Sequence, residues 1–293
     1  AIFRAYDIRG IYNEALTADI AYRIGRAFAT YANSQGVSSI CVGSDARLSS
    51  PDLKQGLLSG FVKSGPDVID IGHVPTPLLY YATYKTAANT GIMITGSHNP
   101  ANYNGMKLVL KRMALSQEEI QNLCQCVQQQ TYLDGEGSIL QQDLKALYLE
   151  DIADNLKLAK RLKVVVDAGN SVAGHYAPQL FRLLGCEVIE LFCDIDGRFP
   201  NHHPDPSETK NLQALIDAVK THQADVGIAF DGDADRLGVI TNTGEIIWPD
   251  RQMMLFARSV LQNHQNAEII FDVKCSKHLA DVIEQLGGKA TMW

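Results

Sequence analysis

Three stretches of the chain share one order of apolar and polar positions: an apolar strand, an Asp, a short polar turn containing Ser, and an amphipathic helix. The stretches begin with residues 39–47, 163–171 and 268–276. Each predicted helix ends at a glycine, which readily adopts the left-handed conformation at a helix C-terminus, and a new apolar strand follows. The three glycines are Gly65, Gly185 and Gly287. Strands and helices that alternate in this order predict right-handed βαβ units and mainly parallel sheets covered by helices.

The first two units continue in the same way beyond this point. A further apolar strand, over residues 91–95 in one unit and 226–230 in the other, leads through a polar loop into another strand. In the second unit, residues 242–244 then predict a hairpin turn. The third unit stops at its second strand, residues 289–293. The repeat therefore predicts that the chain is a fragment, because the polar loop of the third unit would follow Trp293.

This organisation predicts an α/β fold of repeated mixed, mainly parallel sheets. We place a first domain at residues 1–142, a second at residues 143–245, and the incomplete start of a third at residues 246–293. A chain of 293 residues is long for one domain and sufficient for two or three.

The composition is that of an ordinary globular protein, with 46% hydrophobic and 20% charged residues. A net charge of −7 argues against a nucleic-acid partner, although a local basic pocket can still bind an anionic substrate. No apolar stretch of the sequence reaches the length of a membrane span. Six scattered cysteines, and a start at Ala1 without a signal-peptide pattern, predict a cytoplasmic protein with a trimmed or incomplete N-terminus.

The candidate chemistry lies in two polar loops that align with each other residue for residue. Residues 91–100 read GIMITGSHNP, residues 227–236 read GIAFDGDADR, and Ser97 falls opposite Asp233. The second loop carries carboxylates at alternate positions: Asp231, Asp233 and Asp235. Such a set suits a hard divalent cation that prefers oxygen ligands. A hydroxyl that can carry phosphate, beside this site, predicts phosphoryl transfer through a phosphoserine, and we expect the Ser97 loop to face solvent.

The residue types in the two loops also fit simpler structures and a different enzyme class. An isolated Ser most often caps a helix or a turn, and a group of Asp residues can be a simple surface turn. A calcium-binding EF-hand would need Gly and Glu where this chain has Arg236 and Asn242. A phosphatase of the haloacid dehalogenase type would use Asp231 as nucleophile, but such enzymes usually carry Thr or Val at the place of Asp235.

Both loops resemble those of a known enzyme family. Residues 95–100, TGSHNP, and 103–107, YNGMK, resemble the phosphoserine loop of the α-D-phosphohexomutases, especially of their bacterial phosphomannomutase/phosphoglucomutase branch. Residues 230–236, FDGDADR, resemble the metal-binding loop of the same family. Residues 6–10, YDIRG, resemble its opening motif, and residues 272–275, DVKC, resemble the loop of its third domain. The resemblance covers the whole chain.

The resemblance implies a phosphohexomutase fold of four domains around a deep central cleft, the first three built alike. In this chain the third domain is then truncated and the fourth is absent. The missing parts would contact the sugar hydroxyls and the substrate phosphate, so we expect the chain to bind Mg²⁺ but to turn over substrate slowly alone. We also expect a monomer or weak dimer with no membrane partner.

The mechanism that the resemblance implies interconverts 6-phospho and 1-phospho hexoses of mannose, glucose or both. Phospho-Ser97 donates its phosphoryl group to a hexose phosphate, which becomes a hexose 1,6-bisphosphate. The other phosphate of this intermediate then returns to Ser97. The implied cofactor is Mg²⁺, and its implied ligands are Ser97, Asp231, Asp233 and Asp235.

The resemblance also implies roles for side chains around the serine. The residues expected in catalysis are Ser97, Arg9, Lys107 and His98, and those expected to bind substrate are Tyr6, Asn99, Arg236 and Lys274. Lys107 would work as a general acid or base if neighbouring Arg side chains lower its pKa. Arg236 would lie beside the metal and neutralise phosphoryl oxygens.

Three alternative functions remain open on the sequence alone. Phosphoglucosamine mutase is the nearest relative within the family, although the loop motifs favour the mannose and glucose branch. A metal-dependent phosphatase with Asp231 as its nucleophile is the second alternative. A non-catalytic phosphosugar-binding protein is the third, and the presence of Ser97, Arg9 and Lys107 argues against it.

Overall fold

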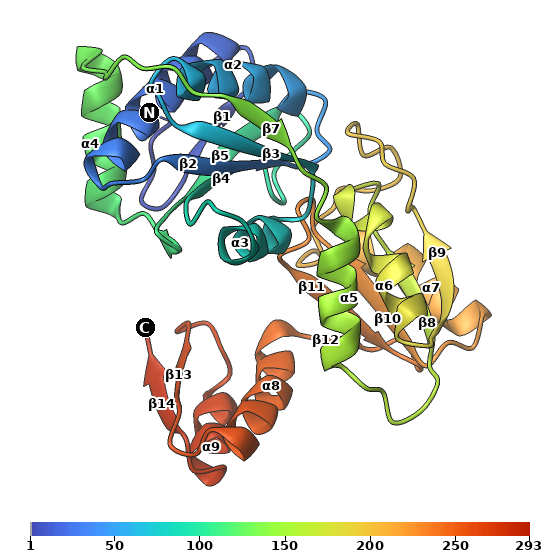
Figure 1. Cartoon of the computed structure of the whole chain (residues 1–293). Coiled ribbons are helices and arrows are strands. Elements are labelled where there is room, and N and C mark those ends of the chain that lie inside the picture. Colours follow the sequence, from blue (N-terminus) through green and yellow to red (C-terminus); the bar gives the residue numbers. More distant parts are fainter. Residues whose placement is uncertain (1) are drawn as a thin grey trace.

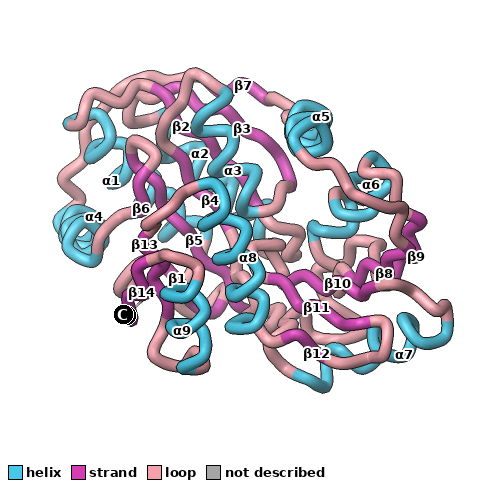
Figure 2. The backbone as a smooth tube through the Cα atoms, turned by 90° about the horizontal axis from the view of Figure 1, so that it is seen from below, coloured by secondary structure: helices cyan, strands magenta, loops and turns pink. Residues whose placement is uncertain are grey.

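The computed structural model describes residues 2–293, and these residues form three separate sheets (Figure 1). The sheets follow one another along the chain, so that the colours in Figure 1 change from one sheet to the next. Seen from below in Figure 2, the strands of the first and second sheets form two separate groups. None of the helices in the described part of the chain is long and apolar enough to cross a membrane.

The first sheet has seven strands in the order β1-β5-β4-β2-β3-β7, with β6 paired to β5. The strands are β1 (Ile8–Ile11), β2 (Ser39–Ser44), β3 (Asp67–His73), β4 (Gly91–Ile94), β5 (Tyr103–Leu110), β6 (Met113–Ala114) and β7 (Ile139–Gln141). Strands β4, β2, β3 and β7 run parallel, whereas β5 is antiparallel to β4 and β1. A short loop after β4 makes β5 antiparallel, because parallel strands need a longer crossover.

Helices cover both faces of the first sheet. Successive residues of a strand point to opposite faces, and apolar residues on both faces need cover from water. These helices are α1 (Ala18–Ser34), α2 (Ser50–Val62), α3 (Thr76–Lys85) and α4 (Gln117–Gln129). Ile40 and Val42 of β2 belong to the core formed with α1, α2 and α4. Cys41, which lies between them, belongs to the core formed with α3. Helix α3 therefore covers the face that is turned toward the second sheet (Figure 1).

The second and third sheets are smaller. The second has the order β12-β11-β10-β8-β9, and the third pairs β13 with β14. Their strands are β8 (Lys163–Asp167), β9 (Glu187–Leu191), β10 (Val226–Phe230), β11 (Leu237–Thr241), β12 (Ile246–Ile247), β13 (Glu268–Phe271) and β14 (Lys289–Met292). The α-helices are α5 (Lys145–Asn155), α6 (Ala177–Leu183), α7 (Gln213–Thr221), α8 (Pro249–Asn263) and α9 (Lys277–Gln285), and η1 (Val172–His175) and η2 (Thr209–Leu212) are 3₁₀-helices.

The strand orders confirm the repeat predicted from the sequence. The order β5-β4-β2-β3 corresponds to β11-β10-β8-β9, with the same parallel and antiparallel pairings, and β2-β3 corresponds to β13-β14. The predicted helix stops Gly65, Gly185 and Gly287 have φ of 104°, 84° and 80°. The sheets are mixed and mainly parallel, as predicted, with the antiparallel strands gathered at one edge of the first and second sheets.

Helices α1 and α2 approach each other closely at Gly60. A Cβ atom added to Gly60 would lie 2.3 Å from the carbonyl oxygen of Tyr22 in α1. Alanine normally stabilises a helix interior by about 1 kcal/mol relative to glycine. Here the clash with backbone should outweigh that gain, because neither helix can move without disturbing the core between them.

We predict that Gly60→Ala lowers the free energy of unfolding by about 1–3 kcal/mol, the usual cost of overpacking a core. Urea denaturation followed by circular dichroism measures the change. Ser59→Ala, an exposed position in the same helix, is the matched control and should have little effect. An unchanged midpoint for Gly60→Ala would mean that α1 and α2 separate at no cost.

Candidate active site

The two loops that align in the sequence meet in the structure. We call residues 95–100 after β4 the serine loop, and residues 231–236 after β10 the aspartate loop. The Ser97 hydroxyl donates a hydrogen bond of 3.0 Å to Oδ2 of Asp231. A Cβ atom on Gly232 would lie 2.3 Å from the Ser97 carbonyl oxygen, so only glycine permits this approach. The site therefore forms between the first and second repeats.

Ser97 is buried, with 2% of its surface exposed, and the expectation of a solvent-facing loop is wrong. The reason is that the aspartate loop covers it from the second repeat. Ser97 also has a φ of 50°, the left-handed conformation that non-glycine residues seldom adopt. It nevertheless lines a pocket of about 570 Å³, so one side of the residue remains accessible to a ligand.

Arg47 shapes the serine loop, although the sequence motifs did not single it out. Its guanidinium is fully buried and donates to four backbone carbonyl groups, those of Ser97, Asn99, Pro100 and Tyr103, at distances of 2.5–3.0 Å. The ring of Phe199, from the second repeat, lies 5.3 Å from the guanidinium carbon. Arg47 lies in the polar turn that follows the first strand and its Asp in each repeat, and this position is the sequence feature that could have identified it.

Asp45 balances the Arg47 charge and holds the start of the serine loop. One carboxylate oxygen, Oδ2, accepts hydrogen bonds from Arg47 Nε, Thr95 Oγ1 and the Gly96 N–H at 2.8–3.1 Å. The other oxygen accepts from the Ser50 hydroxyl at 2.8 Å. A buried ion pair is stable only when its remaining hydrogen-bonding positions are also filled, and this pair meets that condition.

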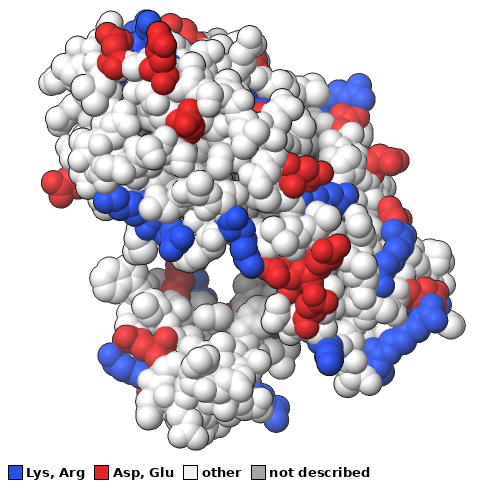
Figure 3. Space-filling model, in the orientation of Figure 1, with Lys and Arg blue, Asp and Glu red and all other residues white. Residues whose placement is uncertain are grey.

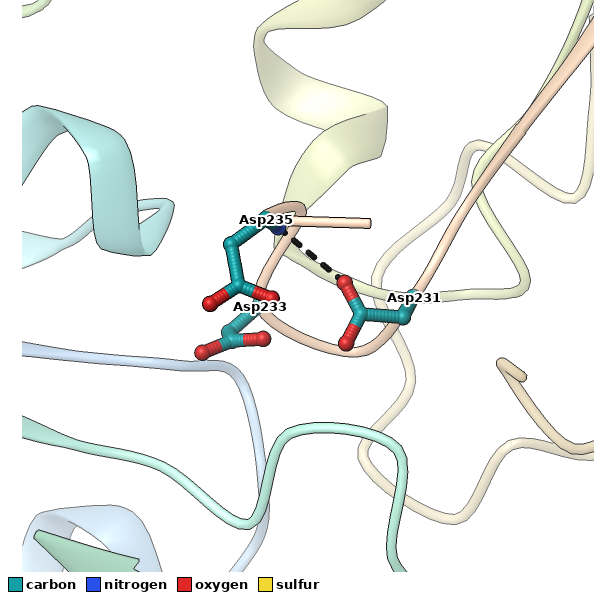
Figure 4. A group of neighbouring side chains, drawn as sticks. All are labelled: Asp231, Asp233 and Asp235. Atoms are coloured by element: carbon teal, nitrogen blue, oxygen red, sulfur yellow. Dashed lines mark hydrogen bonds between the residues drawn. The ribbon is translucent and has the colours of Figure 1, made fainter. Parts of the chain in front are cut away.

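The three aspartates form the group with the chemistry of a metal site. One carboxylate oxygen from each lies within 4.8 Å of the others. Figure 4 shows the carboxylate groups gathered around the turn of the aspartate loop, with the Asp235 N–H donating to Oδ1 of Asp231 at 3.1 Å. Asp231 and Asp233 are fully buried, whereas Asp235 is partly exposed.

The electrostatics of this group fit a divalent cation. Burial, followed by the charges of Asp233 and Asp235, raises the pKa of Asp231 above its usual range. Oδ1 of Asp233 is buried and finds no hydrogen-bond partner among residues 2–293. A buried carboxylate oxygen without a donor is costly, and a cation would satisfy it. Oxygen donors alone favour a hard cation such as Mg²⁺.

Lys107 is tied to the same carboxylates, and the condition for its role as a base, a pKa lowered by neighbouring Arg side chains, is not met. Its ammonium lies 2.6 Å from Asp233 Oδ2 and 2.5 Å from Asp235 Oδ2. Burial acts to lower the pKa of Lys107, but the charges of Asp233 and Asp235 outweigh it and raise the pKa. Lys107 is therefore a protonated cation in this geometry, not a base.

His98 lies on the other side of the serine. Its Nδ1 is 3.3 Å from Ser97 Oγ. Burial lowers the pKa of His98, and the positive charge of Arg236 lowers it further, so the neutral ring is favoured near pH 7. The backbone carbonyl of His98 accepts a hydrogen bond from Nε2 of His203, which holds this residue against the second repeat.

Most of the other predicted residues gather at the pocket, which is lined by Tyr6, Arg9, Ser97, Lys107, Asp235 and Arg236 together with others such as Tyr80. Arg9 pairs with Asp7 at 2.5 Å. The Nε atom of Arg9 is buried, and the described residues offer it no acceptor. Figure 3 shows a hollow between the first two repeats and the third, with Lys and Arg side chains along one rim. Basic groups thus concentrate locally although the chain is acidic overall.

Two predicted substrate contacts lie elsewhere. The Asn99 side chain donates to the Gly96 carbonyl at 2.8 Å and so closes the serine loop on itself. Lys274 follows β13 with 87% of its side chain exposed, 3.7 Å from Asp272. Within the described chain it does not line the pocket beside Ser97.

Comparisons with known proteins show the family of this chain. Family models for the α/β/α domains I and II of phosphoglucomutase/phosphomannomutase match residues 1–134 and 146–244. A phosphomannomutase/phosphoglucomutase of Pseudomonas putida is 52% identical over 293 residues, which cover 100% of this chain and 63% of that protein. A phosphoglucomutase of Neisseria meningitidis serogroup A is 50% identical over 293 residues, which cover 99% of this chain and 64% of that protein. The chain thus spans about 63% of the curated relatives' length.

A solved structure shows the same arrangement of the backbone. The crystal structure of a phosphoglucomutase/phosphomannomutase family protein from Burkholderia thailandensis has a TM-score of 0.97 and 48% sequence identity to this chain. The match covers 100% of this chain and 66% of the crystallised one.

We predict that Arg47→Lys destabilises the protein by about 1–3 kcal/mol for each backbone carbonyl left without a donor. Lysine keeps the charge but has fewer donors and no planar fork, so it cannot reach all four carbonyl groups. Thermal unfolding measures the loss, and Arg258→Lys, an exposed exchange in α8, is the control. Equal stability of the two variants would mean that the serine loop does not depend on Arg47.

Proposed function

Because the chain belongs to the phosphoglucomutase/phosphomannomutase family of α-D-phosphohexomutases, we propose that it transfers a phosphoryl group through Ser97. The proposed reaction interconverts 6-phospho and 1-phospho hexoses of mannose, glucose or both by way of a hexose 1,6-bisphosphate. The observation that carries this proposal is the contact between the hydroxyl of Ser97, which lines a pocket, and Asp231; the pocket lining includes Arg9, Lys107 and Arg236. The names of the relatives support mannose and glucose phosphates as substrates.

In the proposed step the bond between phosphorus and Ser97 Oγ breaks while a bond forms between phosphorus and a sugar hydroxyl oxygen. The sugar hydroxyl would lose its proton, and Ser97 Oγ would take up a proton through His98, whose Nδ1 lies 3.3 Å from that oxygen. In the return step the neutral His98 ring would accept the proton of the Ser97 hydroxyl. Lys107 stays protonated and would stabilise negative charge on the transferring group. The reverse order of events would return the second phosphate of the bisphosphate to Ser97.

Arg9, Tyr6 and Arg236, which also line the pocket, would hold the substrate. Arg9 is suited to an anion because its buried Nε–H finds no acceptor within residues 2–293. An arginine can bind a phosphate with two parallel hydrogen bonds, which orients it as well as neutralising it.

Mg²⁺ is the proposed cofactor, held by Asp231, Asp233, Asp235 and an oxygen of phospho-Ser97, and when bound it supplies positive charge to the transferring phosphoryl group. The free oxygen of Asp233 supports this assignment. The all-oxygen donor set favours Mg²⁺ over softer metals.

A phosphatase with Asp231 as nucleophile is less well supported. Both of its carboxylate oxygens are already engaged: Oδ1 accepts the N–H groups of Asp235 and Arg236, and Oδ2 accepts from Ser97. In the part of the chain that is described, Asp231 does not line the pocket, whereas Ser97 does. The serine is therefore the better placed of the two nucleophiles.

We predict that the chain incubated with ³²P-labelled glucose 1,6-bisphosphate and Mg²⁺ acquires an acid-stable label on Ser97. Ser97→Ala should take up no label and remain folded by circular dichroism, because only the hydroxyl is removed. Ser64→Ala, a buried serine outside the site, is the matched control. An acid-labile label, as an aspartyl phosphate gives, would contradict the proposal.

We also predict that this labelling stops after treatment with EDTA and returns when MgCl₂ is added. Asp231→Asn should need at least about tenfold more Mg²⁺, since a charged ligand is lost. Asp217→Asn, in α7 away from the site, should behave like the parent chain. Labelling that survives removal of the metal would refute the assignment of the cofactor.

A further inference from the structure

Helix α3 of the first repeat begins against the aspartate loop of the second. The Thr76 N–H donates to the backbone carbonyl of Asp233 at 2.9 Å. The Thr76 hydroxyl donates to Oδ2 of the same residue at 2.5 Å. Both residues are fully buried. One residue thus holds Asp233 at its backbone and at its carboxylate.

The sequence around Thr76 explains why this residue donates the backbone hydrogen bond to Asp233. Residues 75–77 read Pro-Thr-Pro, and the two prolines have no N–H, so Thr76 carries the only amide donor of the three. The first N–H groups of a helix have no partner within the helix, and they carry its positive partial charge. Pro75 has a fixed φ and Pro77 restricts the backbone of Thr76, so the direction of the Thr76 N–H is restrained.

The contact with Thr76 determines which carboxylate oxygen of Asp233 remains free to bind a cation. Oδ2 is occupied by the Thr76 hydroxyl and by the ammonium of Lys107. Oδ1 is the buried atom for which the described chain offers no donor. With Oδ2 engaged, rotation of the carboxylate would break both of these contacts, so Oδ1 stays the oxygen that is free for a ligand.

We infer that Thr76 is a positioning residue that orients Asp233 for a divalent cation, an inference that rests on the metal site of the proposed function. Thr76 is uncharged, so it acts on the direction of the carboxylate, whereas Lys107 also contributes charge. Residues that hold a metal ligand from outside typically change metal affinity by about 10- to 100-fold when they are replaced. Thr76 belongs to the first repeat and Asp233 to the second, so the cation site is complete only when the two repeats are docked.

The test is titration of the 293-residue chain with MnCl₂, followed by the electron paramagnetic resonance signal of free Mn²⁺. We expect Thr76→Ala to weaken Mn²⁺ binding by about tenfold. Thr76→Ser keeps the hydroxyl and should restore the parent affinity. Thr83→Ala is the matched control, because Thr83 is a buried threonine of the same helix whose hydroxyl donates to the Tyr80 carbonyl. It should bind Mn²⁺ as the parent chain does.

Asp233→Asn separates failure of this inference from failure of the proposed function. If Asp233→Asn binds Mn²⁺ like the parent chain, the metal site itself is wrong. If Asp233→Asn loses binding while Thr76→Ala keeps the parent affinity, the positioning role of Thr76 is overturned. If circular dichroism shows that Thr76→Ala is unfolded, Thr76→Val is titrated instead. Loss of folding in both variants would assign Thr76 a purely structural role and would also overturn the inference.

Discussion

Four backbone carbonyl groups of the segment from Ser97 to Tyr103 converge on the guanidinium of Arg47, whose charge is balanced by Asp45. This buried ion pair keeps Ser97 in a left-handed conformation and presents its hydroxyl to Asp231. A charge can stay buried only when it is paired and its hydrogen-bond donors have acceptors. The serine loop therefore cannot change conformation without breaking the hydrogen bonds between Arg47 and the four carbonyl groups. The serine is thereby held in place without a bound ligand, which is what electrostatic preorganisation of the proposed site requires.

The second constraint is that the site belongs to two repeats at once. The first contributes Ser97, Lys107 and the start of α3, and the second contributes the aspartate loop. Two copies of one topology place their loops after equivalent strands, β4 and β10, and docking brings these loops into contact. Opposite charges then meet across the junction, because the ammonium of Lys107 lies against the buried carboxylates. Chemistry divided in this way depends on the interface as much as on either repeat.

Much of the fold and part of the site could be predicted from the sequence. Elements that follow the repeat were found because their apolar period and glycine stops are local signals. Helix α1 and the edge strands β1 and β7 lie outside the repeat, so that pattern did not include them. The burial of Ser97 and the raised pKa of Lys107 were also missed. Both arise from residues more than 100 positions away in the chain, such as Asp231 and Asp233.

Residue type and spacing along the chain are enough to predict the α/β repeat, the family resemblance and the pairing of one hydroxyl with three carboxylates. The tertiary fold sets the surroundings of those groups. It buried Ser97 under the aspartate loop, left Oδ1 of Asp233 without a donor in the described chain, and brought Thr76 against Asp233. The physical reason is that burial, pKa and hydrogen-bond pairing depend on neighbours in space, and docking of the two repeats brings those neighbours together.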